Sequence, residues 1–445
     1  MANNISVALR CITQDLESFL PERSIRQVCL EVGYRWRNRQ FDPVATLHLF
    51  ILQILNFNTA ITHLRHLAKV PINAASYCKA RMRLPLKVLQ RLLESSAQTM
   101  AGGKGACRLW NGLRVYLTDG SCTIAPDTPG LQKQFPQPKS QKKGCGFPQV
   151  KILGLFDAFT GLVIQTLYFS LYHEQSQVWR LHRLLGKGDL LVADRGFCSY
   201  VHLAMLQSQG ILGLFRMHQV RIVRFGPGRK SHQKGQTGKP RSRFLKRLGK
   251  YDQLVEWIKP KRKPKWMKQK QWAQMPDTLP MRELRYIIRA NGQRTQTVMI
   301  ATTLLDPIRY PKEEVVALYG IRWTVETHFA ELKTTLKMRK VKSQTPQGVR
   351  KEVTVYCLVY NLIHMVMLAA ARRQRVDPGR ISFIDTVRWL LSAQPGEPLP
   401  LLVVNPLRPG RHEPRVVKDR HDKYKLMTRP RTELRKALKK QGGKA

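Results

Sequence analysis

The chain has 445 residues, and it carries 77 Lys and Arg against 29 Asp and Glu, a formal net charge of +48. That length is enough for a large core and two or three domains. So large a positive charge requires a polyanionic partner, and nucleic acid is favoured because phosphate neutralisation supplies most non-specific affinity. An anionic membrane surface is the alternative. However, the sequence shows no basic amphipathic anchor and no run of about 18 apolar residues.

The apolar run, the cysteines and the N-terminus indicate a cytoplasmic protein. The most apolar segment, residues 357–371, is interrupted by Asn361 and His364 and is expected to be a buried core helix. No CxxC spacing occurs among the eight cysteines, and the N-terminus lacks a signal-peptide plan. His173 and His328 are isolated in the sequence, so we expect them to hydrogen-bond locally and not to bind a metal.

Residues 1–105 have a helical pattern throughout. Helices are predicted over residues 42–55, 59–69, 73–83 and 86–95. Basic residues at Lys79, Arg81 and Arg83 would suit a helix-turn-helix-like DNA reader. A plain helical cap on the following domain explains the same pattern equally well, so both interpretations stay open.

Residues 106–220 mix strands and helices. Strands are predicted at 114–118, 150–156, 162–169, 189–194 and 212–217, with a hairpin turn at 157–161 and helices at 174–185 and 200–209. Three strands, then helix, strand and helix, is the RNase H-like order. A loop rich in Pro, Gln and Lys, residues 123–147, is predicted to be a mobile surface loop near Asp119.

Two of these predicted strands end in an aspartate. LRVYLTD delivers Asp119 and is followed at once by Gly120, while DLLVADRGF delivers Asp194 before a turn. Strand ends in α/β sheets place side chains in the crevice beyond the sheet, where ligands bind. A single such Asp is more often a helix cap or turn residue. Two together favour a site.

Residues 221–305 form a basic segment. Between residues 221 and 275 there are 18 Lys and Arg against 2 acids, interleaved with Trp257, Trp266 and Trp272. Such a composition suits phosphate contact and base stacking, although each tryptophan is more simply a packing residue. Strands at 285–288 and 297–302 are predicted to form a hairpin around Asn291-Gly292.

A helix is predicted to begin at Pro311 and to run past Lys333. On an ideal helix Tyr319, Arg322, Glu326 and Lys333 share one narrow stripe at the edge of the apolar face. A carboxylate between two cations and a phenol suits holding a metal beside a phosphodiester. A solvated charged face is the alternative, and Glu331, on the far side of the helix, illustrates it.

These residues resemble the DDE transposases with an RNase H-like catalytic domain. The spacing Tyr319-x2-Arg322-x3-Glu326-x6-Lys333 is similar to the YREK signature of bacterial insertion-sequence family four, and DGS at Asp119 and DRGF at Asp194 also resemble that family. The resemblance extends from about residue 40 to the basic tail. It implies an α/β RNase H-like core interrupted by a β-rich insertion, with a helical N-terminal domain and a basic helical C-terminal region.

The resemblance also implies the domain plan and the roles of the site residues. We expect a DNA-binding domain at 1–105, core segments at 106–220 and 306–395, the insertion at 221–305 and a basic tail at 396–445. Helices are predicted at 347–372, 377–392 and 432–440. Asp119, Asp194 and Glu326 are the expected catalytic metal ligands, and Tyr319, Arg322 and Lys333 the expected DNA-binding residues.

The expected chemistry is phosphoryl transfer with two divalent ions, Mg²⁺ or Mn²⁺, which favour oxygen ligands. The expected partners are double-stranded DNA, as transposon ends and target, and a second protomer on that DNA, with no membrane and with nucleoid association. Two alternatives remain. One is an RNase H-like nuclease or resolvase that cuts but never joins strands, and the other is an inactive DNA-binding protein.

Overall fold

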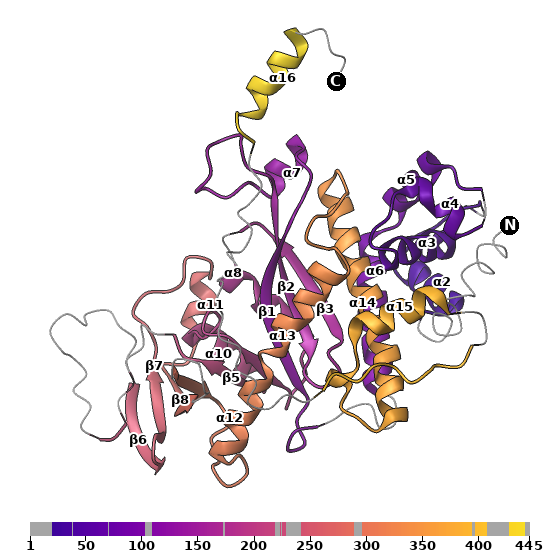
Figure 1. Ribbon diagram of the computed structural model, residues 1–445. Coiled ribbons are helices and arrows are strands. Elements are labelled where there is room, and N and C mark those ends of the chain that lie inside the picture. The colour runs from indigo at the N-terminus through magenta and orange to yellow at the C-terminus, as the bar shows by residue number, and fades with distance from the viewer. Residues whose placement is uncertain are drawn as a thin grey trace, which may run out of the picture.

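One mixed β-sheet runs through the part of the chain that the computed structural model describes (Figure 1). That part comprises residues 20–37, 39–69, 71–102, 109–171, 174–218, 223, 225–227, 242–288, 296–393, 397–406 and 427–440. Nine strands lie in the order β3-β2-β1-β4-β5-β9-β8-β7-β6. Their bounds are β1 Val115–Ile124, β2 Gln149–Asp157, β3 Val163–Phe169, β4 Leu190–Ala193, β5 Leu212–Arg216, β6 Ser242–Gly249, β7 Asp252–Ile258, β8 Thr278–Ile288 and β9 Gln296–Thr302.

The centre of this sheet is parallel, and its flanks are antiparallel. β1 pairs with β4 and β4 with β5 in parallel, while β2 and β3 continue antiparallel on one side and β9, β8, β7 and β6 on the other. All four residues of β4 are buried, as expected for a parallel strand with both faces covered. The predicted α/β class is therefore confirmed as a mixed α/β fold with a large mixed sheet.

The strands predicted in the first half of the chain all form, with one correction. β1 does not end at Asp119 but continues to Ile124, because β2 supplies a backbone partner for every residue from Tyr116 to Ile124. Asp119 therefore lies within a strand, opposite Gly154, and the chain does not turn at Gly120.

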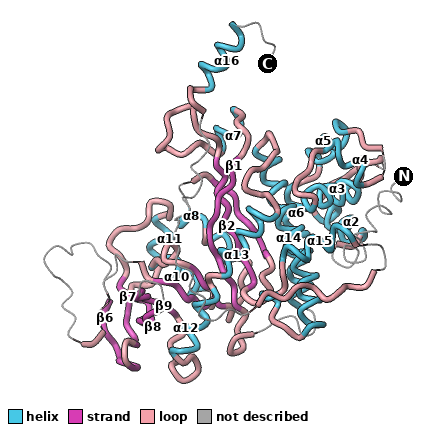
Figure 2. The backbone as a smooth tube through the Cα atoms, in the orientation of Figure 1, coloured by secondary structure: helices cyan, strands magenta, loops and turns pink. Residues whose placement is uncertain are grey.

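The basic segment continues this sheet. The predicted pair of strands forms as β8 and β9, and β9 joins the segment to β5. The Asn291-Gly292 turn lies outside the described residues. The sequence did not predict β6 and β7, because basic residues obscure the alternation of buried and exposed positions in β6, and β7 begins with the buried polar residues Asp252 and Gln253. Figures 1 and 2 show β6, β7 and β8 at the side of the molecule away from the N-terminal helices.

The turn between β2 and β3 forms where the sequence predicted it. The Asp157 carboxylate accepts hydrogen bonds from the backbone N–H of Phe159 at 3.1 Å and of Thr160 at 2.8 Å. Gly161 closes the turn with a φ of +72°, a conformation that favours glycine. A Cβ atom built there would lie 2.8 Å from His364 Cε1, so the backbone approaches this ring more closely than any other residue type allows.

Replacement of Gly161 by Ala is expected to lower the free energy of unfolding by about 2–4 kcal/mol. The change adds the left-handed backbone strain of about 1–2 kcal/mol to a steric clash of similar size. Gly188 is the matched control, since its φ is +87° but a Cβ atom would meet nothing within 4 Å. In urea denaturation, Gly188→Ala should therefore lose only the stability that the left-handed backbone strain costs. Equal losses in both variants would contradict the close approach at Gly161.

The N-terminal helices begin with side-chain caps. Asp42 caps α3 by accepting from the N–H of Ala45 at 2.8 Å, and Asn73 caps α5 by accepting from the N–H of Ser76 at 2.9 Å. The helices of this region are α2 Glu22–Glu31, α3 Pro43–Leu55, η1 Ile61–His63, α4 Leu64–Leu67, α5 Ala74–Arg83 and α6 Leu86–Gly102. Three of the predictions are confirmed. The predicted helix at 59–69 is two short turns instead, and α2 was not predicted.

The long helix α14 (Pro346–Gln374) lies at the centre of the helical layer. By length and composition it could cross a membrane, which corrects the expectation that no segment could, but 83% of its most apolar window is buried inside the protein. Asn361 explains how a polar residue fits there: its amide accepts from the N–H of Val163 and donates to the carbonyl of Val163, both at 2.8 Å. The predicted core helix is therefore confirmed, and Asn361 ties it to strand β3.

The remaining helices have ten residues or fewer. They are α7 Pro129–Gln134, α8 Glu174–Gln177, α9 Trp179–His182, α10 Tyr200–Ser208, α11 Gln269–Ala273, α12 Lys312–Ile321, α13 Thr324–Ala330, η2 Glu331–Thr335, η3 Pro378–Arg380, α15 Phe383–Ser392 and α16 Arg431–Lys440. The single helix predicted at 174–185 is divided into α8 and α9, because the chain turns at Val178 to bury Val178 and Leu181.

The predicted surface loop at 123–147 is anchored to the body of the protein. It contains helix α7, and Leu131 and Phe135 are fully buried. The segment before α16 docks on it, since the N–H of Arg431 donates to the Gly144 carbonyl at 3.1 Å and the Arg431 guanidinium pairs with Asp127. Helix α16 itself projects away from the sheet (Figure 1).

Candidate active site

Asp119 and Asp194 meet on neighbouring parallel strands. Thr118 of β1 lies opposite Ala193 of β4, so the two aspartates follow at the next position of each strand. Asp194 stands just beyond the end of β4, where its carbonyl accepts from the N–H of Phe197 at 3.0 Å and turns the chain. Asp119 Oδ1 accepts from the N–H of Gly120 at 2.7 Å. The parallel pairing of two sequence-distant strands thus brings these carboxylates together.

Arg322 joins Glu326 to this pair. Its Nη1 atom lies 3.5 Å from Asp119 Oδ2, and its Nη2 atom lies 3.4 Å from Glu326 Oε1. Arg322 is only 3% exposed, and its Nε atom has no hydrogen-bond partner in the described part of the chain, whereas Glu326 is exposed. Both distances are long for charge-assisted hydrogen bonds, which are usually 2.7–2.9 Å. The guanidinium is therefore held between the two carboxylates without a strong bond to either.

The neighbouring carboxylates also affect the pKa of Asp119. Burial raises the pKa of Asp119, and the charges of Asp194 and Glu326 raise it further, while the Gly120 N–H and the Arg322 guanidinium act in the opposite direction. Like charges raise a carboxyl pKa in this way only when they are close. The three acids therefore form one cluster, as the sequence predicted.

Tyr319 lies beside the cluster, buried within helix α12. Its residue is 1% exposed, and its hydroxyl has no hydrogen-bond partner among the described protein groups. Burial is the main cause of the raised pKa of Tyr319, and the charge of Asp194 raises this pKa further. The Arg322 charge acts in the opposite direction. An unpartnered buried hydroxyl is costly, so this one is available to a ligand.

Lys333 is not brought into contact with the acids. It is half-buried, and among the described residues its side chain makes no hydrogen bond or ion pair with Asp119, Asp194 or Glu326. The prediction of one continuous helix, on which the shared stripe of residues depended, is wrong. Hydrogen bonds to the third residue back tighten the chain around Arg322 and Trp323, and η2 then widens into a π-helical turn. The rotation per residue therefore changes twice between Tyr319 and Lys333.

A second cluster of ionisable groups lies on the other side of this helix. Glu331 is 17% exposed and faces His328 and His364, and ligand atoms of all three residues lie within 4.8 Å of one another. The expectation that Glu331 is a solvated charge was wrong, because α14 covers it. His328 is hydrogen-bonded, as expected, with its Nδ1 atom 2.8 Å from the Tyr360 hydroxyl. The sequence did contain a signal for this cluster, because His328 and Glu331 are three residues apart and therefore share a helix face. His173 lies outside the described residues.

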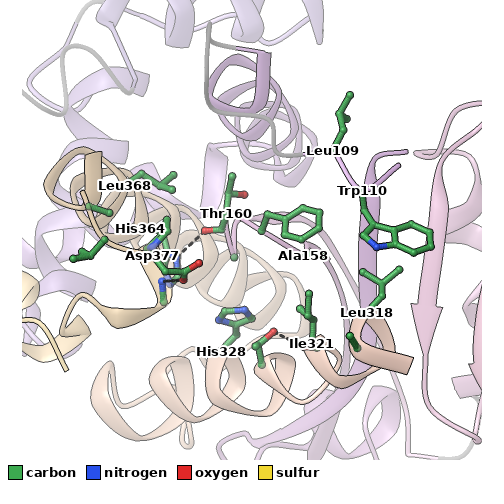
Figure 3. Close-up of a pocket in the computed structure, with 18 of the residues that line it drawn as sticks. Leu109, Trp110, Ala158, Thr160, Leu318, Ile321, His328, His364, Leu368 and Asp377 are labelled. Atoms are coloured by element: carbon green, nitrogen blue, oxygen red, sulfur yellow. Dashed lines mark hydrogen bonds between the residues drawn. The ribbon is translucent and has the colours of Figure 1, made fainter. Parts of the chain in front are cut away.

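A cavity in the described part of the chain lies next to this second cluster. It has a volume of about 820 Å³, and His328, His364, Thr160 and Ile321 are among its lining residues (Figure 3). None of the three clustered acids lines it. Glu326 is exposed, and Asp119 and Asp194 are partly buried.

The tryptophans of the basic segment pack inside the protein. Trp257 is 1% exposed and donates its Nε1–H to Glu283 at 3.0 Å, and Trp272 is 9% exposed. Trp266 stacks on His202 with ring centroids 5.6 Å apart. The interpretation of these residues as packing residues is confirmed.

Known transposases are similar to this chain over most of its length. Residues 110–362 match the family model described as the transposase DDE domain. Transposase InsG for insertion sequence element IS4, from Escherichia coli strain K12, is 25% identical over 366 residues, which is 78% of this chain and 76% of InsG. A piggyBac transposase structure, a synaptic complex with hairpin DNA, matches 86% of this chain and 79% of its own at 10% identity and a TM-score of 0.41.

The class of protein is thus the DNA transposases, enzymes of phosphoryl transfer. Within that class, the chain belongs to the DDE transposases, and it is similar to a transposase of insertion sequence element IS4. The family resemblance drawn from Tyr319, Arg322, Glu326 and Lys333 is therefore confirmed at the level of the family, as is the predicted enzyme class.

Proposed function

We propose that this transposase binds the terminal inverted repeats of its insertion sequence and catalyses metal-dependent DNA cleavage and strand transfer. The observation that supports this most strongly is the cluster of Asp119, Asp194 and Glu326, drawn from β1, the end of β4 and α13. We propose these three acids as the catalytic metal ligands.

The donor set fits hard divalent cations. Three carboxylates offer oxygen ligands only, which suits Mg²⁺ or Mn²⁺. Transposase DDE domains generally use divalent metal ions. The charges of Asp194 and Glu326 raise the pKa of Asp119, and bound cations would offset this repulsion between carboxylates. When bound, two ions supply activation of the attacking oxygen and stabilisation of the leaving oxygen in an in-line displacement.

Arg322 and Tyr319 are proposed to hold the DNA phosphate beside the acids. The Arg322 guanidinium is buried in place but weakly bonded to Asp119 and Glu326, so it can donate to a phosphate oxygen without moving far. The free hydroxyl of Tyr319 offers a second donor. Arginine suits such contacts because its planar fork matches two oxygens at once.

Lys333 is proposed to contact DNA away from the acids. Lys333→Ala is expected to weaken end complexes roughly tenfold, the loss of about one charge-assisted contact, and to slow cleavage. Gel shifts and cleavage assays on an end duplex measure both effects. Lys187→Ala is the matched control, since Lys187 is exposed before β4, at the opposite end from Asp194. Identical behaviour of the two variants would remove Lys333 from the DNA-binding surface.

We further propose an RNase H-like core built from residues 106–220 and 306–395. The strand order β3-β2-β1-β4-β5, with β1, β4 and β5 parallel, supports it. Residues 221–305 are the β-rich insertion, residues 1–105 the DNA-binding domain and residues 396–445 a basic tail. The net charge of +48 supports binding of both transposon ends and target DNA.

A dimer on DNA is the proposed working form, because an element has two ends to cut, and the proposed location is the cytoplasm, at the nucleoid. The test is a labelled duplex that carries the terminal inverted repeat, incubated with purified protein and Mg²⁺. We expect cleavage at the repeat boundary and joining to target. Cleavage without joining would support a nuclease instead, and metal-independent binding alone would indicate an inactive copy.

A further inference from the structure

The second cluster presents four donor atoms around one point. Glu331 Oε2 lies 3.7 Å from His328 Nδ1, 3.6 Å from His364 Nε2 and 3.1 Å from the Tyr360 hydroxyl. The Tyr360 hydroxyl also lies 2.8 Å from His328 Nδ1. His364 and Tyr360 come from α14, while Glu331 and His328 come from η2 and α13. Two buried helices therefore share one polar site.

The tautomer of His364 makes this site unusual. Its Nδ1 atom lies 3.1 Å from the Thr160 carbonyl, which can only accept, so Nδ1 carries a proton and donates it. Nε2 of neutral His364 then presents a lone pair toward the Glu331 carboxylate. His364 is 5% exposed, and its Nε2 atom has no hydrogen-bond partner among the residues that the structure describes. At 3.6 Å the gap is too long for a hydrogen bond, so two electron-rich atoms face each other uncompensated.

We propose that His328, Glu331 and His364 bind a transition-metal cation of the zinc class, with the Tyr360 oxygen as the nearest fourth donor. Ligands about 2.0–2.1 Å from a tetrahedral Zn²⁺ ion lie about 3.3 Å apart, so the observed separations of 3.6 and 3.7 Å need to close by only a few tenths of an ångström. Imidazole nitrogens favour Zn²⁺ over Mg²⁺, which prefers six oxygens. This site is therefore chemically distinct from the three-carboxylate cluster.

The surroundings suit such an ion. The hydrogen bond from His364 Nδ1 to a backbone carbonyl is the usual support of a metal-binding histidine. Figure 3 shows His328 beside the cavity of about 820 Å³ that both histidines line, and this cavity offers an entry route.

The ion would fasten the helix that carries Glu326 to the core. It would cross-link η2 to α14, and through the Thr160 carbonyl it would reach the turn between β2 and β3. Gly161 fits this arrangement, because a Cβ atom there would lie 2.9 Å from His328 Cε1 and 2.8 Å from His364 Cε1. We therefore assign the cation a structural role, beside and not within the cleavage site.

The test measures Zn²⁺ retained by untagged, full-length protein. The protein is stripped with a chelator, loaded with Zn²⁺ in the presence of excess Mg²⁺ and dialysed, and metal is quantified by mass spectrometry. We expect about one Zn²⁺ per chain, and a loss of affinity of tenfold or more in His364→Gln. The double variant His63→Gln, His66→Gln is the control, because these histidines lie outside the site on the η1–α4 turn and should not matter.

Two further measurements keep the proposal open to refutation if His364→Gln fails to fold. Glu331→Gln preserves side-chain size and should also lose the ion. Co²⁺ bound to the unaltered protein should give the visible spectrum of a tetrahedral nitrogen and oxygen site. A thiolate charge-transfer band, no retained Zn²⁺, or unchanged retention in folded His364→Gln would each overturn the proposal. Asp119→Asn should retain Zn²⁺ fully, so failure here is distinguishable from failure of the cleavage site.

Discussion

Asp119→Asn is expected to abolish cleavage of the terminal repeat, by about 10³-fold or more. The substitution keeps the size of the side chain and its acceptor for the Gly120 N–H, but it removes the charge at the centre of the acid cluster. Metal stabilisation of the reacting oxygens is worth several kcal/mol, and each 1.4 kcal/mol is tenfold in rate. Single-turnover cleavage of a labelled end duplex in Mg²⁺ measures the loss.

End binding should survive in this variant, because we place the DNA contacts on Arg322, Tyr319 and Lys333. Asp189→Asn is the matched control. Asp189 is a partly buried carboxylate just before β4, which accepts from the Gly186 N–H at 2.7 Å and lies at the other end of that strand from Asp194. It should cleave normally. Cleavage by Asp119→Asn at the rate of Asp189→Asn would refute the assignment of Asp119.

Asp252→Ala is expected to lower the free energy of unfolding by about 3–5 kcal/mol, because it leaves the buried charge of Arg282 without its partner carboxylate. Asp252 of β7 accepts from Arg282 Nε at 2.9 Å and Nη2 at 2.6 Å, and Arg282 of β8 is fully buried. Arg282 also donates to the Tyr310 carbonyl at 2.7 Å, just before α12. The loss should therefore loosen the connection between the basic segment and the helix that leads to Glu326.

Urea denaturation followed by the fluorescence of buried Trp257, which lies on β7, reports this loss. Arg243→Ala is the control, since Arg243 pairs with Glu256 across β6 and β7 but its side chain is 67% exposed. Exposed pairs contribute about 0–1 kcal/mol. If both variants lost stability equally, the buried pair would not be the stabilising contact.

Local signals determined much of the fold in advance. The strands at β2, β3, β4 and β5 and the helices α3, α5, α10 and α14 followed from apolar periodicity and from caps such as Asp42. These signals act within a few residues, and the structure obeys them. The family signature was likewise readable, because spacing along one chain is a property of the sequence itself.

Tertiary structure decided what local signals could not. β2 extends β1 through Asp119, and the parallel pairing of β1 with β4 sets Asp119 beside Asp194. The helix after Pro311 is broken and widened by packing, which separates Lys333 from the acids.

The sequence by itself thus determined the class of enzyme and most of the secondary-structure elements, and it singled out the three acids that we propose as its metal ligands. Only the folded chain decided that Glu331 lies among His328, His364 and Tyr360, because these residues come from two helices that meet through burial of their apolar faces. Periodicity shows which face of a helix is buried, but it does not show which distant residues that face will meet.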